Sequence, residues 1–202
     1  VDNMKLTGLM LAADAGLNDI ATDILHHFAE VNAIDLDGST ALMFAAASGN
    51  INLLNILIDL NAEVNQKNLK GQTALLFAAI NGHQTTVASL MEKGANADLK
   101  DNAGRPALDY ISVKGDVGMV KILAANGANV NIQETHGWTP LMRATYRGYT
   151  EMEEVLLANG ADPNIKDNAG HTAESWRRTS STYSHLLNKL NHLNKMLKQL
   201  RW

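Results

Sequence analysis

Hydrophobic and polar positions return along this chain at a fixed interval of 33 residues. A threonine or proline leads each period, at Thr7, Thr40, Thr73, Pro106, Thr139 and Thr172. Two positions later the residue is a leucine, at Leu9, Leu42, Leu75, Leu108 and Leu141. Nine positions after the lead residue it is a glycine, at Gly16, Gly49, Gly82, Gly115 and Gly148. Because several columns keep one register, the spacing indicates an internal repeat.

The residue types within a period predict two helices and a turn. The lead threonine can cap a first helix, and proline is tolerated in a first turn. The glycine ends this helix, and a leucine-rich stripe such as Leu54 and Leu57 predicts a second one. Asn61 stands where other periods have glycine, as expected where a helix end needs a positive φ. The turn to the next period begins with an acidic or amide residue, at Asp35, Asn68, Asp101, Glu134 and Asp167.

Residues 136–170 show the pattern most fully, with Thr-Pro-Leu, a small-residue pair, a glycine and Asn-Gly-Ala-Asp in order. A 33-residue period with this content resembles the ankyrin repeat. The resemblance implies an all-α solenoid of stacked helix-turn-helix units with extended turn tips. We therefore expect one elongated domain over residues 1–202. Its units would span residues 4–36 as an N-terminal cap, 37–69, 70–102, 103–135, 136–168, and 169–202 as a C-terminal cap with an extra helix.

The segment after Thr172 departs from the repeat. Five leucines, spaced by four and three residues, predict a helix with one apolar seam: Leu186, Leu190, Leu193, Leu197 and Leu200. We expect a capping helix that covers the last unit. Two alternatives stay open, a short coiled-coil or partner-binding helix and a basic amphipathic helix on a membrane surface.

Composition narrows the class of protein. The chain has no cysteine, which excludes disulfides and thiolate chemistry. It has no apolar run of the roughly 18 residues that span a bilayer and no pattern of a secretory signal peptide. We expect a cytoplasmic protein without a membrane partner. The net charge of −4 hides an asymmetry, because residues 1–99 have 4 Lys/Arg against 11 Asp/Glu and residues 100–202 have 13 against 10.

The sequence offers little for catalysis or metal binding. It contains no Gly-rich phosphate loop, His-Glu-x-x-His or calcium-loop pattern, and its glycines follow the 33-residue period. His26 and His27 are adjacent, and His185 and His192 are seven apart, whereas paired helical ligands are usually four apart. We therefore expect no enzyme, catalytic residue, cofactor, metal or small-molecule substrate. A pI of about 5.9 argues against a nucleic-acid partner, despite the basic C-terminal half.

Two columns break the family pattern. The slot that holds histidine in familiar ankyrin units is occupied by Met10, Met43, Leu76, Asp109 and Met142. We expect apolar contacts there instead of a histidine hydrogen-bond network. Glu153 occupies a column of apolar residues, and a buried carboxylate is costly unless it is paired. We expect it to reach solvent, Arg177 or Arg178.

The resemblance implies that function lies on the concave face made by the turn tips and the first helices. On that face the fourth and fifth units, residues 103–135 and 136–168, offer the side-chain types most enriched at binding hot spots. We expect the site at Trp138, Tyr146, Arg147, His136, Arg105 and Lys114. Trp138 in particular should be exposed, so that its removal costs the fold little. The alternative is that these side chains are simply tolerated on a solvated face.

We expect a monomer that binds another protein through an acidic or mixed surface. A second hypothesis is a structural or self-assembling unit, in which the acidic N-terminal half of one molecule meets the basic half or the terminal helix of another.

Overall fold

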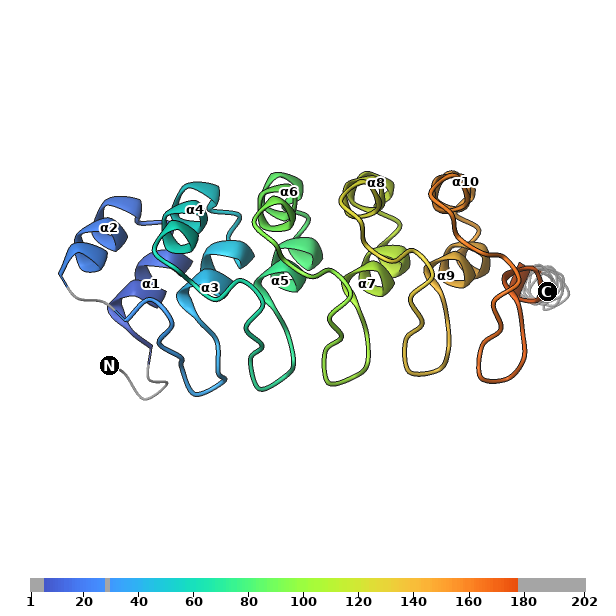
Figure 1. The fold of residues 1–202 in the computed structure, drawn as a ribbon, viewed down its shortest axis with the longest axis horizontal. Helices are drawn as coiled ribbons and strands as arrows, with labels where there is room; N and C mark the ends of the chain where they lie inside the picture. Colours follow the sequence, from blue (N-terminus) through green and yellow to red (C-terminus); the bar gives the residue numbers. More distant parts are fainter. Residues whose placement is uncertain (1–5, 28–29, 178–202) are drawn as a thin grey trace, which may run out of the picture.

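The computed structural model describes residues 6–27 and 30–177, and these form a row of helix pairs joined by long turns (Figure 1). The first helices lie side by side in one layer, the second helices form a second layer, and the turns project away from both. Within these ranges no residue is in a strand. The first helices are α1 (Gly8–Asp14), α3 (Ala41–Ala47), α5 (Ala74–Asn81), α7 (Ala107–Lys114) and α9 (Pro140–Arg147). The second helices are α2 (Asn18–His26), α4 (Ile51–Asp59), α6 (Gln84–Glu92), α8 (Val117–Ala125) and α10 (Thr150–Ala158).

The lead threonines act as helix caps, as predicted. The Oγ1 atoms of Thr7, Thr40, Thr73 and Thr139 accept the backbone N–H three residues later at 3.2–3.4 Å. Pro106 takes the same cap position before α7 without a side-chain hydrogen bond. At the other helix ends, Gly82 has φ +80° and Asn61 has φ +65°, which confirms that the asparagine replaces a glycine in left-handed backbone.

Small residues let neighbouring first helices approach closely. The second member of each small pair is buried, at Ala13, Ala46, Ala79, Ser112 and Thr145. Leucines from both helices fill the space between layers, among them the fully buried Leu42, Leu54, Leu75, Leu90, Leu108 and Leu123. Ser112 fits because its hydroxyl donates to the backbone carbonyl of Leu108 at 2.7 Å. The fourth unit is therefore packed as completely at this position as its neighbours.

Asparagines tie successive helix pairs together at the loops that follow the second helices. Asn32, Asn65 and Asn131 each use their two side-chain atoms on the next loop, where Oδ1 accepts a backbone N–H and Nδ2 donates to a carbonyl. Asp98 occupies the same column between α6 and α8. Its carboxylate accepts from the Asn129 N–H at 2.9 Å but has no N–H to donate.

A further helical turn, residues 173–177, begins after α10 and ends the described part of the chain. Arg177 forms an ion pair with Glu174. Glu153 is only 5% exposed, and its carboxylate also contacts the guanidinium of Arg177. This confirms the pairing expected for Glu153, and it joins the last turn to α10. The predicted seam from Leu186 to Leu200 lies outside the described residues.

Candidate functional site

Trp138 is half-buried, not exposed as the sequence suggested. It lies in the turn before α9 and packs against the core. Its ring centroid is 4.3 Å from that of Trp176 and 5.5 Å from that of Tyr146. The guanidinium of Arg143 sits 4.7 Å from its ring centre. The burial of Trp138 comes from Trp176 in the following unit and from Arg143 on α9.

The sequence analysis did not single out Trp176, although its ring contacts three other aromatic side chains at this end of the row. Its ring lies 5.9 Å from Tyr146 and 5.1 Å from His171, and its indole N–H donates to Asp167 Oδ2 at 2.9 Å. We call Trp138, Tyr146, His171 and Trp176 the aromatic cluster. Trp176 stands four positions after the lead threonine, as Arg143 and Tyr110 do in earlier units. Reading that column at the 33-residue interval would have found it.

The turn carboxylates explain why this column matters. One oxygen of each turn residue accepts the backbone N–H groups two and four positions later, as Asp167 does from Ala169 at 2.9 Å and from His171 at 2.8 Å. In Asp101 and Asp167 the other oxygen accepts from the side chain four positions after the lead residue. Tyr110 donates to Asp101 at 2.5 Å and Trp176 to Asp167 at 2.9 Å. In the second and third units the column holds Phe44 and Phe77, which cannot donate.

Arg143 links the fourth and fifth units through two carboxylates. Its Nε donates to Asp109 Oδ1 at 2.7 Å, and its Nη2 lies 3.8 Å from Glu134 Oε2. Asp109 is buried in the slot for which apolar contacts were expected, so that expectation is wrong at this position. Met10, Met43, Leu76 and Met142 are buried apolar residues, as expected.

The two carboxylates respond differently to their surroundings. Burial raises the pKa of Asp109 above its ordinary value, although the hydrogen bond and charge of Arg143 oppose this. Burial also acts to raise the pKa of Glu134. Hydrogen bonds from the His136 side chain and from the backbone of Trp138 and His136 outweigh it, so the pKa of Glu134 is lowered. Glu134 is therefore held as a charged acceptor, whereas Asp109 depends on Arg143.

Arg105 contacts residues of its own turn and of the helix that follows it. Its guanidinium lies 4.4 Å from the centre of the Tyr110 ring, and the phenol is bound to Asp101. Burial and that hydrogen bond raise the pKa of Tyr110 to about 12, so the hydroxyl remains a donor. Arg105 is half-buried and contacts this pair instead of the aromatic cluster.

Tyr146, Arg147, His136 and Lys114 are the exposed members of the predicted set. Tyr146 is 41% exposed at the edge of the aromatic cluster, and Arg147 follows it at the end of α9. Lys114 lies at the same position of α7, where its ammonium contacts the carbonyl of Ile80. Within residues 6–27 and 30–177, neither Lys114 nor Arg147 forms an ion pair. The His136 side chain is 81% exposed, with Nδ1 3.0 Å from Glu134 Oε2.

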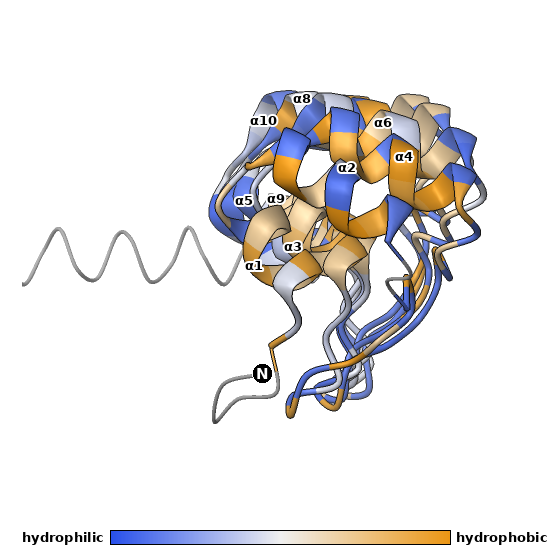
Figure 2. Ribbon diagram, turned by 90° about the vertical axis from the view of Figure 1, so that its left-hand side faces the viewer, coloured by the Kyte–Doolittle hydropathy of each residue, from blue (hydrophilic) through white to orange (hydrophobic). Residues whose placement is uncertain are grey.

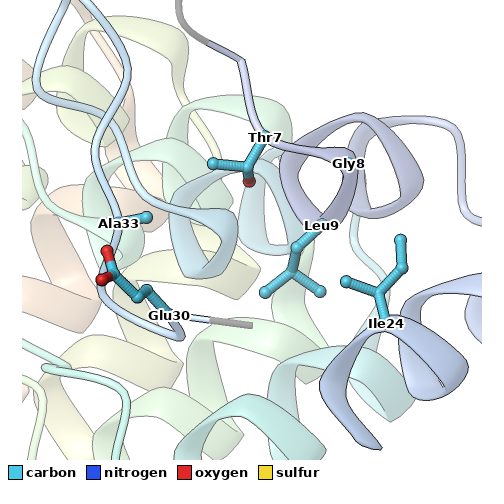
Figure 3. A pocket seen from close by; sticks show the side chains of 6 residues that line it. All are labelled: Thr7, Gly8, Leu9, Ile24, Glu30 and Ala33. Atoms are coloured by element: carbon cyan, nitrogen blue, oxygen red, sulfur yellow. The ribbon is translucent and has the colours of Figure 1, made fainter. Parts of the chain in front are cut away.

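A pocket of about 260 Å³ lies far from this surface, at the first helix pair (Figure 3). Leu9 and Ile24 form its apolar wall, and Glu30 is the one ionisable side chain among the six residues that line it. Elsewhere in the described ranges, no three His, Cys, Asp or Glu side chains gather as metal ligands would. The helices of the described residues include none long and apolar enough to cross a bilayer.

Comparisons with known proteins agree with the arrangement of these helices. A family model described as ankyrin repeats in three copies matches residues 9–101, 46–134 and 90–167. The structure is similar to the ankyrin repeat domain of Bcl-3, a unique member of the IkappaB protein family, with a TM-score of 0.82 and 30% identity over 87% of this chain and 79% of that one. An ankyrin repeat domain from Acinetobacter baumannii AYE gives a TM-score of 0.79 and 31% identity over 86% of this chain and 91% of its own.

A search for relatives among curated protein sequences gives no match. The family model, however, covers well over half of the 202 residues. The chain therefore belongs to the ankyrin repeat family.

Proposed function

We propose that this protein is a non-enzymatic interaction module that binds a partner protein on the concave face of its fourth and fifth units. Ankyrin repeats are in general protein-protein interaction modules. In stacked repeats the recurring residues are used for folding, which leaves the variable surface positions for binding. The proposed contact residues are Tyr146, Arg147, Lys114 and His136, with Trp138 and Arg105 behind them.

One observation carries the proposal: the exposed Tyr146 contacts two tryptophan rings, and Lys114 and Arg147 at the ends of their first helices form no ion pair within the described part of the chain. The rings of Trp138 and Trp176 both contact the ring of Tyr146, at centroid distances of 5.5 and 5.9 Å. A side chain held in place loses little conformational entropy when a partner binds. Tyrosine and arginine are also residue types that dominate binding energy at interfaces.

The charges on the second helices behave differently. Lys93 forms an ion pair with Asp59 at 3.1 Å, and Lys121 forms one with Glu151 at 3.3 Å. Each ion pair joins two neighbouring helix pairs. Lys114 and Arg147, on the first helices, have no such carboxylate in the described part of the chain. A partner with carboxylates would supply one, and this favours an acidic or mixed partner surface.

The test compares two charge reversals by quantitative affinity capture. The variant Lys114→Glu/Arg147→Glu changes the proposed site, and Lys93→Glu/Lys121→Glu is the matched control on the second helices. We expect at least one protein to be retained by both the wild type and the control. The amount of that protein retained by the site variant should be lower by about tenfold or more. Equal retention by all three baits, with unchanged melting curves, would contradict the proposed site.

A further inference from the structure

Two exposed leucines mark the tips of adjacent turns, which lead into the second and third units. Leu36 is 53% exposed and Leu69 is 70% exposed. The backbone N–H of Leu69 donates to the carbonyl of Asp37 at 2.8 Å, which holds the two tips against each other. In Figure 2 hydrophobic colour gathers at the ends of turns that are otherwise mostly hydrophilic. A pair of apolar side chains thus stands in solvent at one place.

The fold does not require leucine at these tips. In later units the same column holds polar residues that bind the preceding turn. The side-chain amide of Asn102 donates to the Leu69 carbonyl at 2.7 Å, and that of Asn168 donates to the Thr135 carbonyl at 3.0 Å. The Thr135 hydroxyl donates to the Ala103 carbonyl at 2.7 Å. A leucine side chain cannot form these hydrogen bonds, so its exposure at the tip does not stabilise the stack of turns.

The first helices continue the apolar character of the tips. Phe44 and Phe77 occupy the column from which Tyr110 and Trp176 reach the turn carboxylates, and both are half-buried against the core. By the same register they lie beside turns 35–38 and 68–71. In the column of the turn tips, leucine is therefore followed along the row by asparagine and threonine. In the column on the first helices, phenylalanine in the second and third units is replaced by Tyr110 in the fourth and Arg143 in the fifth.

We propose that one partner segment crosses both halves of this face, with aliphatic side chains over Leu36 and Leu69 and carboxylates over Lys114 and Arg147. The inference rests on the proposed function and assigns the partner's chemistry and the half of the face that each of its two groups would contact. The apolar tips select aliphatic side chains because burying such surface is favourable. Lys114 and Arg147, which have no ion pair in the described part of the chain, select carboxylates, and a segment with only one of the two groups would leave the other half of the face unmatched.

The experiment is a selection of random displayed peptides on three proteins. These are the wild type, Leu36→Ser/Leu69→Ser, and Lys114→Glu/Arg147→Glu. We expect the wild type to select peptides with aliphatic residues toward one end and Asp or Glu toward the other. The tip variant should lose the aliphatic preference alone, and the charge variant the acidic preference alone.

Fluorescence polarisation with one selected peptide then measures the contributions separately. The tip variant should weaken binding about tenfold or more, the equivalent of about 1.4 kcal/mol. The control is Leu60→Ser/Leu157→Ser, which changes two leucines that are each 46% exposed, one at the C-terminal cap of α4 and one on α10. It should change binding less than about twofold. If the tip variant binds as well as the wild type while the charge variant fails, the inference is wrong and the proposed function stands. If selected peptides ignore the charge variant, the proposed function itself is wrong.

Discussion

Arg143 on α9 donates to Asp109 on α7, with 2.7 Å between Nε and Oδ1, and so joins two helix pairs through a charge in an otherwise apolar column. Asp109 is buried and Arg143 is half-buried. Taking one member away leaves the other in a site from which water is largely excluded.

Arg143→Met should lower the free energy of unfolding by about 2–3 kcal/mol at neutral pH, because Asp109 would be left buried and unpaired. Adding Asp109→Met, the residue type of the equivalent Met10, Met43 and Met142, should restore most of the loss. The raised pKa of Asp109 gives the sign of the pH dependence: its cost is absent when it is protonated and appears as the pH rises through its folded-state pKa. Urea denaturation against pH tests this, and a deficit that grows on acidification would contradict it.

Trp138→Ala should destabilise the fold by about 2 kcal/mol, since the change removes a half-buried ring from between Trp176 and Arg143. The matched control is Gln72→Ala, in the same column of the third unit. It should change stability by less than about 0.5 kcal/mol. Thermal melts of both variants measure the difference. An unchanged melting temperature for Trp138→Ala would show that the ring does not contribute to the stability of the fold.

Glu153→Leu should stabilise the protein by about 1 kcal/mol, because it removes a buried carboxylate whose Oε1 has no hydrogen-bond partner among the described residues. Leucine is the residue of the second unit in this column. Arg177→Ala should destabilise the wild type by about 1–2 kcal/mol and have little effect after Glu153→Leu. A double-mutant cycle by urea denaturation gives the coupling energy. Additive effects would mean that the pair does not act as one.

Trp176→Phe should cost about 1 kcal/mol at neutral pH, because it keeps a ring in the aromatic cluster but removes the N–H donor to Asp167. Burial tends to raise the pKa of Asp167, but hydrogen bonds from the His171 backbone and the Trp176 indole lower it overall. A lowered pKa means stability that is present above the unfolded-state value and lost as the pH falls through the folded-state value. The difference between wild type and variant should therefore shrink in acid, as measured by urea denaturation.

Most of the fold could be predicted from the sequence because its cause is periodic. The lead threonines and the left-handed Asn61 follow local rules that act within a few residues. The pairing of Glu153 with Arg177 could also be foreseen, since a carboxylate in an apolar column needs a partner and few cations are near in sequence.

The candidate site was less predictable because its contacts run between units. Trp138 looks like a free surface residue when only its own column is read, and its burial comes from Trp176 in the following unit. Asp109 looks like an isolated departure until Arg143, 34 positions later, is placed against it. A comparison of columns finds residues that differ, but it does not show which differences compensate each other.

The Asp98 side chain forms only one hydrogen bond to the next loop among the described residues, and this has a mechanical consequence. A linear stack has no shared core, so a pulling force is carried through each joint in turn, and the joint with the fewest bonds yields first. At the other described joints in this column, an asparagine makes two hydrogen bonds to the next loop, whereas Asp98 makes one. We expect the row to part between α6 and α8 when its ends are drawn apart with optical tweezers. Asp98→Asn should then raise the rupture force and move the break to another joint.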